Sequence, residues 1–153
     1  MALIVQKYGG TSVGDVDRIR GVAQRVKGYV DQGHQVVVVV SAMSGETNRL
    51  VSMGRDIGGD HGSAREMDVL TASGEQVTIS LLSLGLLSIG VQAKSFLADQ
   101  ISIKTDNVHG KARIQEIDTD ALRAELDAGC VPIVAGFQGV NDLGEITTLG
   151  RGG

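Results

Sequence analysis

Apolar residues follow two alternating patterns along this chain. Uninterrupted apolar or β-branched runs are typical of buried parallel strands, whereas apolar residues spaced every three or four positions indicate amphipathic helices. Strands are therefore predicted at residues 2–8, 35–42, 91–98 and 130–137. Helices are predicted at residues 15–33, 47–57, 64–89 and 118–129.

Individual residue types predict where several of these elements begin, end or turn. Asp15 is expected to cap the first helix and Gly33 to end it, while the strand at 2–8 is expected to be buried on both faces. The helix at 64–89 is expected to be interrupted at "TASGE". Residues 99–114 are expected to form an irregular or hairpin excursion, and residues 140–149 a hairpin around Asp142–Gly144.

The alternation of strands and helices predicts the fold class. Strands that follow one another through helical crossovers run parallel, and the crossovers are right-handed. We therefore expect an α/β protein with a mostly parallel sheet and helices on both faces.

Composition excludes several classes of function. Hydrophobic residues make up 42% of the 153 residues and aromatic residues only 3%, so aliphatic side chains must fill the core. The net charge is −4 without any basic run, which argues against nucleic-acid binding. A single cysteine, Cys130, and no signal-peptide pattern favour the cytoplasm. The apolar segment 79–91 is too short to span a bilayer, so no membrane association is expected.

The tips of three predicted strands offer small residues and free backbone N–H groups, in "KYGGTSVG", "SAMSG" and "GFQG". Ligands bind beyond the carboxyl ends of strands in open α/β sheets. Glycine lets the backbone approach an anion, a following helix adds a favourable dipole, and Lys7 adds a full positive charge. The stretch suits a phosphoryl group; the alternative is a tight turn whose lysine points to water.

Four motifs in order resemble those of the aspartate kinases (aspartokinases) of the amino-acid kinase superfamily. They are "KYGGTSVG", "VVVVVSAMSGETNRLV", "SGEQVTISLL" and "GFQGVNDLGEITTLGRGG", and the match spans the whole chain. The resemblance implies a three-layer αβα sandwich with a mostly parallel sheet. It also implies transfer of the ATP γ-phosphoryl to the side-chain carboxylate of L-aspartate, with Mg²⁺ as a cofactor, on the route to lysine, threonine, methionine and diaminopimelate.

The resemblance also implies roles for individual residues. Lys7 matches the lysine beside the transferring phosphoryl, and the other phosphate-contacting positions are Gly9, Gly10 and Ser41. The substrate-binding positions are Thr47, Glu75, Phe137 and Arg151. Arg151 can grip a carboxylate with two hydrogen bonds, and Glu75 can accept from the substrate ammonium.

Each of these residues also has an alternative interpretation in which its role is only structural. Glu75 would then be an exposed helix residue, Thr47 an N-cap and Ser41 a turn residue, and Arg151 would be disordered. The histidines His34, His61 and His109 lack metal-ligand spacing and are expected at the surface, so no metal site is predicted among the protein side chains.

The family pattern runs beyond the end of this sequence. Its motif continues G-R-G-G-S-D, whereas this chain stops at Gly153. The resemblance implies that residues 1–153 form the amino-acid-binding part of a catalytic domain, without the ATP-binding half and the ACT regulatory domains. Such a truncated chain is expected to be inactive alone and to self-associate, and the whole enzyme to be a homo-oligomer. The alternatives are a related amino-acid or carbamate kinase, and a non-catalytic module that binds an acidic metabolite or assembles with a partner.

Overall fold

The fold alternates strands and helices as the apolar pattern predicts. The computed structural model describes residues 1–150. In chain order the elements are β1 (Leu3–Tyr8), η1 (Gly10–Val13), α1 (Val16–Asp31), β2 (Gln35–Val40), α2 (Glu46–Gly58), η2 (Gly59–His61), α3 (Ala64–Ser88), β3 (Ala93–Phe96), η3 (Ala98–Ile101), β4 (Ile103–Thr105), β5 (Ile114–Ile117), α4 (Asp120–Asp127), β6 (Val131–Ala135), β7 (Gln138–Val140) and β8 (Ile146–Thr148), where η marks a short 3₁₀ helix.

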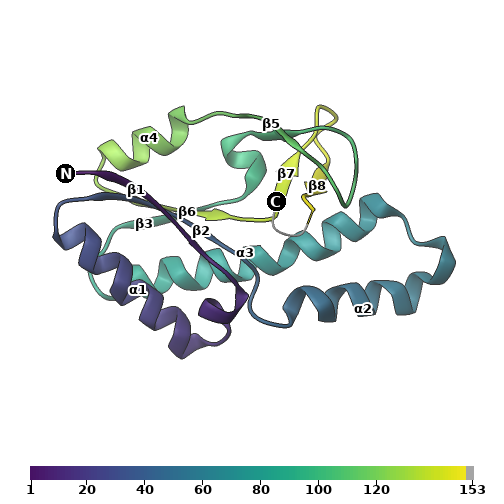
Figure 1. Ribbon diagram of the computed structural model, residues 1–153, viewed down its shortest axis with the longest axis horizontal. Coiled ribbons are helices and arrows are strands. Elements are labelled where there is room, and N and C mark those ends of the chain that lie inside the picture. Colours follow the sequence, from purple (N-terminus) through teal and green to yellow (C-terminus); the bar gives the residue numbers. More distant parts are fainter. Residues whose placement is uncertain (151–153) are drawn as a thin grey trace.

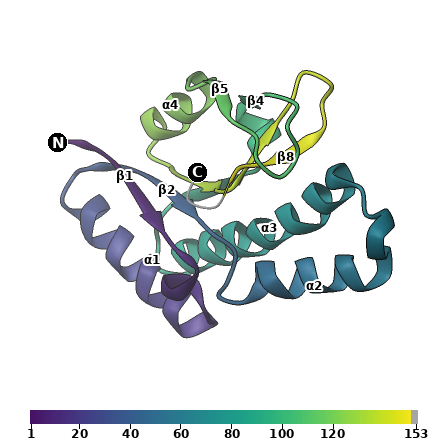
Figure 2. The same cartoon turned by 45° about the vertical axis from the view of Figure 1, so that its right-hand side comes forward.

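A four-stranded parallel sheet forms the middle layer of the molecule. Its strand order is β1-β2-β6-β3, so the β-branched run of β2 lies at an interior position, as predicted. Helices α1 and α3 cover one face, and α4 covers part of the other (Figures 1 and 2). This arrangement confirms the three-layer α/β architecture.

Apolar side chains fill the space on both sides of this sheet. One cluster joins the sheet to α1 and α3 and includes Val26, Val38, Leu82, Leu86 and Ile133. A smaller cluster on the other face joins the sheet to η3 and α4. Because α1 and α3 supply most of the larger cluster, the sheet is anchored mainly from their side.

The two predicted hairpins meet in a second, mixed sheet with the strand order β5-β4-β7-β8. Strands β7 and β8 pair antiparallel, which confirms the hairpin at 140–149. Strands β4 and β5 also pair antiparallel, so of the two alternatives for 99–114 the hairpin is correct, although its second strand continues to Ile117. Strands β4 and β7 then pair in parallel at Lys104 and Val140. This pairing was not predicted, because it joins segments that are far apart in the sequence.

Helix α3 runs without a break from Ala64 to Ser88, so the predicted interruption at residues 71–75 is wrong. The Thr71 hydroxyl donates to the Met67 carbonyl one turn earlier (2.8 Å), so its polar side chain is satisfied within the helix. Gly74 is needed for close packing rather than for a turn, because an added Cβ would lie 2.8 Å from the Cβ of Ala42.

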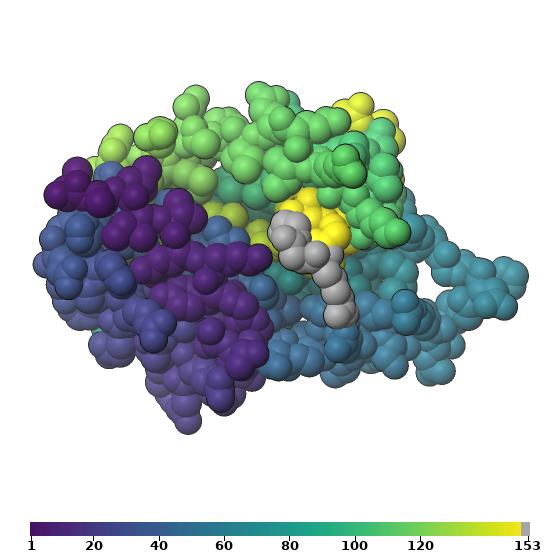
Figure 3. All heavy atoms as spheres, viewed as in Figure 1, coloured from purple at the N-terminus to yellow at the C-terminus, as the bar shows by residue number. Residues whose placement is uncertain are grey.

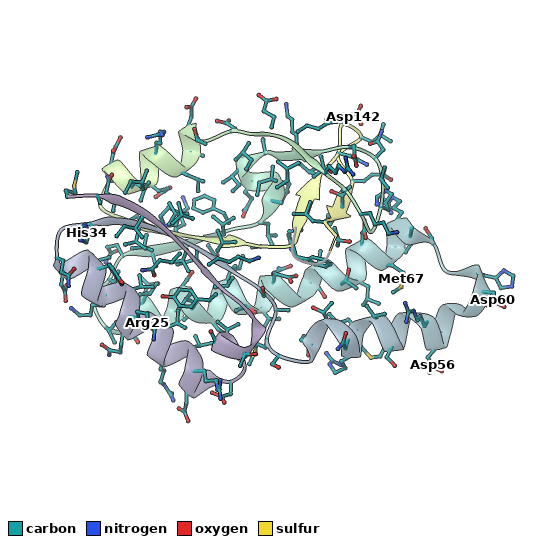
Figure 4. All side chains as sticks on the ribbon, viewed as in Figure 1. Arg25, His34, Asp56, Asp60, Met67 and Asp142 are labelled. Atoms are coloured by element: carbon teal, nitrogen blue, oxygen red, sulfur yellow. The ribbon has the colours of Figure 1, made fainter. Side chains whose placement is uncertain are left out.

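Helix α2 packs antiparallel against the first part of α3, and both extend beyond the sheet (Figure 1). The Met67 side chain points into the space between these helices (Figure 4). A Cβ on Gly54 would lie 2.6 Å from the Met67 sulfur, so the glycine lets the two helices approach. By length and composition α3 is the one helix in residues 1–150 that could cross a membrane, but half of its apolar window is buried in the fold.

Strand β1 lies at an edge of the sheet, which corrects the expectation that it is buried on both faces. Leu3 and Val5 are 48% and 65% exposed. Their side chains border an apolar groove of about 360 Å³ whose other wall includes Ile117 and Leu122. Figure 3 shows β1 in purple at the surface, with a recess between it and the green segment that contains β5 and α4. No described residue covers this face of β1.

Candidate active site

A cavity of about 330 Å³ lies where three parallel strands end. The turns that follow β1, β2 and β6 all reach it, as expected for an open α/β sheet. It is lined by Lys7, Gly10, Thr11, Ser41, Ala42, Met43, Ser44, Gly45, Thr47, Asn48, Glu75 and Phe137.

The cavity brings together most of the residues singled out from the sequence. Six of them line it, namely Lys7, Gly10, Ser41, Thr47, Glu75 and Phe137. Gly9 does not line the cavity but directly precedes Gly10, in extended backbone at the start of η1. Arg151 lies outside the described residues.

The turn after β2 is held between two glycines. A Cβ on Gly10 would lie 3.1 Å from the Ala42 carbonyl oxygen, and one on Gly74 would lie 2.8 Å from the Ala42 Cβ. The Ala42 N–H donates to Oε1 of Glu75 (3.2 Å). Residues 41–45 are therefore fixed against both the β1 turn and α3, and their backbone forms a rigid wall of the cavity.

Glu75 is the most unusual group in the cavity. Its side chain is on the buried face of α3 with only 1% exposed, so the alternative of an exposed helix residue is wrong. Oε1 accepts the Ala42 N–H, but Oε2 is buried without a hydrogen-bond partner among the described residues. Burial raises the pKa of this carboxyl from 4.5 to about 7, although backbone hydrogen bonds oppose the shift. An unpaired buried oxygen is costly, so the site favours a ligand that donates a hydrogen bond to it.

Lys7 supplies positive charge to the same cavity. It is the last residue but one of β1, is exposed, and forms no ion pair or hydrogen bond with any described residue. An ammonium that is not neutralised by the protein is available to an anionic ligand.

The helix that adds a dipole to the cavity is α2 rather than α1. The Asp15 side chain accepts from the Arg18 N–H (2.7 Å), so the N-terminus of α1 is already capped by a carboxylate. Helix α2 starts after Gly45 with no side-chain cap, and Gly45 and Thr47 line the cavity. Thr47 lies inside the first turn of α2, so its alternative role as an N-cap is wrong. The Glu46 N–H donates to the Met43 carbonyl (2.9 Å), so the favourable term for a bound anion is the dipole at the start of α2.

Phe137 closes the cavity in an uncommon backbone conformation. Its φ is 67°, in the left-handed region that non-glycine residues seldom adopt. Its carbonyl accepts the Leu149 N–H (2.8 Å), which ties the turn after β6 to the end of β8. Phe137 lines both this cavity and a second one of about 460 Å³, as does Thr47.

Sequence reasoning missed a second polar cluster on α3. Asp68 is 2% exposed and accepts four hydrogen bonds, one of them from His109. The His109 side chain is only 15% exposed, so the expectation that it lies at the surface is wrong. Asp68 precedes Glu75 by seven residues, which is two helical turns, so helical periodicity places both on the buried face.

Among residues 1–150 no group of three or more His, Cys, Asp and Glu side chains is arranged to hold a metal ion. The cavity therefore offers an anion site formed by Lys7 and the start of α2, and beside it a buried carboxylate. This combination suits a ligand that carries negative groups and a hydrogen-bond-donating cation.

Comparisons with known proteins identify the family of the chain. The model of the amino acid kinase family matches residues 2–153. An aspartokinase of Pseudomonas aeruginosa is 58% identical over the whole chain, which spans 37% of the length of that relative.

Two solved structures share the fold. The aspartate kinase of Synechocystis is 47% identical with a TM-score of 0.83, and the alignment covers 99% of this chain and 24% of that one. E. coli aspartokinase III, solved in complex with aspartate and ADP, is 25% identical with a TM-score of 0.87, covering 100% of this chain and 44% of that one. By its motifs, its fold and its match over residues 2–153, this chain belongs to the amino acid kinase family.

Proposed function

We propose that this chain carries the phosphoryl-acceptor side of an aspartate kinase. The reaction transfers the γ-phosphoryl of ATP to the side-chain carboxylate of L-aspartate and gives 4-phospho-L-aspartate and ADP. The relatives in the comparisons are named aspartate kinases, and one structural neighbour was solved with aspartate and ADP. The observation that carries the proposal is the pairing, in one cavity, of an unneutralised Lys7 with the buried, incompletely bonded Glu75.

Two groups of lining residues match the two parts of the reaction. Lys7, Gly10 and the start of α2 are suited to the phosphate oxygens, since they offer one full charge and several backbone donors. Oε2 of Glu75 is suited to the substrate ammonium, which can donate the hydrogen bond that this oxygen lacks. Thr47 and Phe137 border the space between them, and Arg151 is assigned the substrate carboxylate from its motif alone.

The transfer itself requires little covalent chemistry from the protein. A carboxylate oxygen of aspartate forms a bond to the γ-phosphorus, and the bond to the bridging oxygen of ADP breaks. No proton has to be removed from the ionised acceptor, so positioning and charge stabilisation provide most of the rate enhancement. Lys7 would balance negative charge on the transferring group, and Ser41 and Gly9 would support the phosphate loop.

Mg²⁺ is expected to accompany ATP, as is general for phosphoryl transfer. Residues 1–150 contain no cluster of three or more potential metal ligands, so we assign no protein ligand for the ion in this part of the chain. The whole enzyme is proposed to act in the cytoplasm, in amino-acid biosynthesis, as a homo-oligomer.

The proposal is tested by aspartate-dependent release of ADP. The assay uses this chain and, beside it, the same chain extended past Gly153 with the remaining sequence of the P. aeruginosa relative, which is 58% identical over the shared part. We expect turnover from the extended chain with aspartate and none with glutamate. Little or no turnover is expected from the 153 residues alone, since they span only 37% of the relative. An extended chain that folds but releases no ADP in response to aspartate would overturn the proposal.

A further inference from the structure

The Asp68 carboxylate joins three segments that are far apart in the sequence. Oδ2 accepts from the Thr148 N–H (3.0 Å), the Gly110 N–H (3.2 Å) and Nδ1 of His109 (2.8 Å). Oδ1 accepts from the Thr148 hydroxyl (2.6 Å). The carboxylate therefore connects α3 to the loop between β4 and β5 and to the end of β8, and it has a partner for each oxygen.

His109 fixes the orientation of this carboxylate. A carboxylate only accepts hydrogen bonds, so Nδ1 of His109 must carry the proton in this contact. On its other side the ring lies 3.6 Å from Glu145, measured from Nε2 to Oε1. Glu145 in turn pairs with Arg65 at the start of α3, and its Oε1 accepts from the Asn141 amide (3.0 Å).

The hydrogen bonds of Asp68 end next to the candidate site. Thr148 is followed by Leu149, whose N–H donates to the Phe137 carbonyl (2.8 Å), and Phe137 lines the cavity that contains Glu75. Asp68, Thr148 and Leu149 border the second cavity, which meets the first at Phe137 and Thr47. Asp68 and Glu75 thus lie on the same face of one helix, and each lines one of the two cavities that Phe137 borders.

We propose that Asp68, oriented by His109, is a positioning residue that holds the end of β8 and Phe137 in place and thereby sets the affinity for the amino-acid substrate. It would do so without touching the substrate. The inference rests on the proposed aspartate kinase function. Its physical basis is that a strained turn such as that at Phe137 persists only when surrounding contacts hold it. Asp68 holds Thr148 through two hydrogen bonds, and the adjacent Leu149 N–H bonds the Phe137 carbonyl.

The Asp68→Asn variant tests this role in the extended chain. An amide keeps the size of the side chain but removes its negative charge, which weakens the three hydrogen bonds to the remaining oxygen. With the NH2 group in place of Oδ1, the buried Thr148 hydroxyl also loses the acceptor of its proton. We expect the KM for aspartate to rise by roughly tenfold or more, with the KM for ATP within about twofold of the wild type. Asp142→Asn is the matched control, because Asp142 is an exposed carboxylate at the tip of the β7–β8 hairpin, which also contains Thr148 (Figure 4).

Two further measurements distinguish the positioning role of Asp68 from a general contribution to stability. Val26→Ala removes fully buried apolar atoms from α1 and lowers the melting temperature without touching the hairpin, so its KM for aspartate should stay unchanged. If Asp68→Asn fails to fold, His109→Asn and His109→Ala replace it. The asparagine retains a donor at the position of Nδ1, so it should keep the KM near the wild type, while alanine should raise it.

The inference and the proposed function fail in different ways. A wild-type extended chain without aspartate-dependent turnover would remove the proposed function and, with it, this role. Two outcomes would overturn the positioning role alone, provided that the wild-type extended chain shows normal turnover. One is an unchanged KM for aspartate in Asp68→Asn, and the other is an equal change of this KM in His109→Asn and His109→Ala. A rise in KM for Val26→Ala as large as that for Asp68→Asn would do the same.

Discussion

The two halves of α3 are buried to a similar degree but by different chemistry. The second half buries Ile79, Leu82 and Leu86 in the larger apolar cluster. The first half buries Asp68, Thr71 and Glu75, and two of these are carboxylates. Apolar burial stabilises the fold, whereas a buried carboxyl must find partners and costs stability where it lacks one. One helix therefore serves as a core element at one end and as the wall of a candidate active site at the other.

The largest effect is expected outside the core, at Lys7. In the extended, active chain, Lys7→Ala should lower kcat on the order of 10²–10³-fold, by analogy with the loss of one charge-stabilising donor. The unfolding free energy should change little, because Lys7 is exposed and makes no contact with a described polar partner. Steady-state kinetics and urea denaturation measure the two quantities. Lys104→Ala, at another exposed lysine, should leave kcat unchanged, and a loss below about tenfold for Lys7→Ala would contradict the phosphate role.

A substitution in the apolar half of α3 should affect stability alone. Leu82 is fully buried, so Leu82→Ala is expected to lower the free energy of unfolding by about 2–5 kcal/mol. Leu84 lies on the outer face of the same helix and is 63% exposed. Leu84→Ala should therefore cost less than about 0.5 kcal/mol, as is usual at the surface. Urea denaturation of this chain compares them, and equal losses would mean that α3 does not pack as described.

In the polar half of α3, a substitution at Glu75 is expected to raise the free energy of unfolding rather than lower it. Its pKa is raised from 4.5 to about 7, so folding favours the protonated form. The carboxyl therefore destabilises the folded state progressively as the pH rises from about 4.5 to 7, and fully above that range. Glu75→Gln should raise the free energy of unfolding by up to about 3 kcal/mol at pH 8 and change it little at pH 4.

The same variant should weaken the proposed site. Because an amide carries no charge for an ammonium, Glu75→Gln is expected to raise the KM for aspartate and leave the KM for ATP nearly unchanged. Denaturation at several pH values and kinetics of the extended chain check the two halves of this prediction. A variant that loses stability equally at pH 4 and pH 8 would show that Glu75 serves chiefly to hold Ala42.

The smallest effect is expected where the two halves meet, at Gly74. An added Cβ would lie 2.8 Å from the Ala42 Cβ, so Gly74→Ala should cost roughly 1–3 kcal/mol through overpacking. Ala42→Gly should restore part of this loss in the double variant. Unfolding free energies of the two single variants and the double variant form a cycle. Additive losses would indicate that the turn at residues 41–45 moves away from α3 at little cost.

The sequence predicted the apolar part of the molecule better than the polar part. Uninterrupted valines in β2 and the helical period of α1 identify their elements, because burial of those side chains depends mainly on local spacing. The threonine, serine and glycine of "TASGE" lower its helix propensity, yet α3 continues through the stretch, because tertiary packing overrides a weak local preference. Gly74 is present because the Ala42 Cβ leaves no room for a side chain.

The candidate site was predicted from motifs, and its supporting contacts were not. Lys7, Ser41, Glu75 and Phe137 do line one cavity. The bonds between Asp68 and its partners connect residues that are 41 to 80 positions apart in the chain, and no local pattern reports such pairs. The raised pKa of Glu75 likewise depends on burial, which the spacing of charged residues does not reveal.

The contact of Gly10 and Gly74 with Ala42 also limits how this protein can vary. A Cβ at position 10 would meet the Ala42 carbonyl oxygen, so only a shift of the backbone could make room for it. A Cβ at position 74 would meet the Ala42 Cβ, so a larger side chain there is tolerated only if residue 42 becomes smaller or the backbone shifts. In a library of random variants, acceptable substitutions at positions 42 and 74 should therefore occur as linked pairs, whereas position 10 should remain glycine. A redesign of the turn that follows β2 would have to change α3 in the same step.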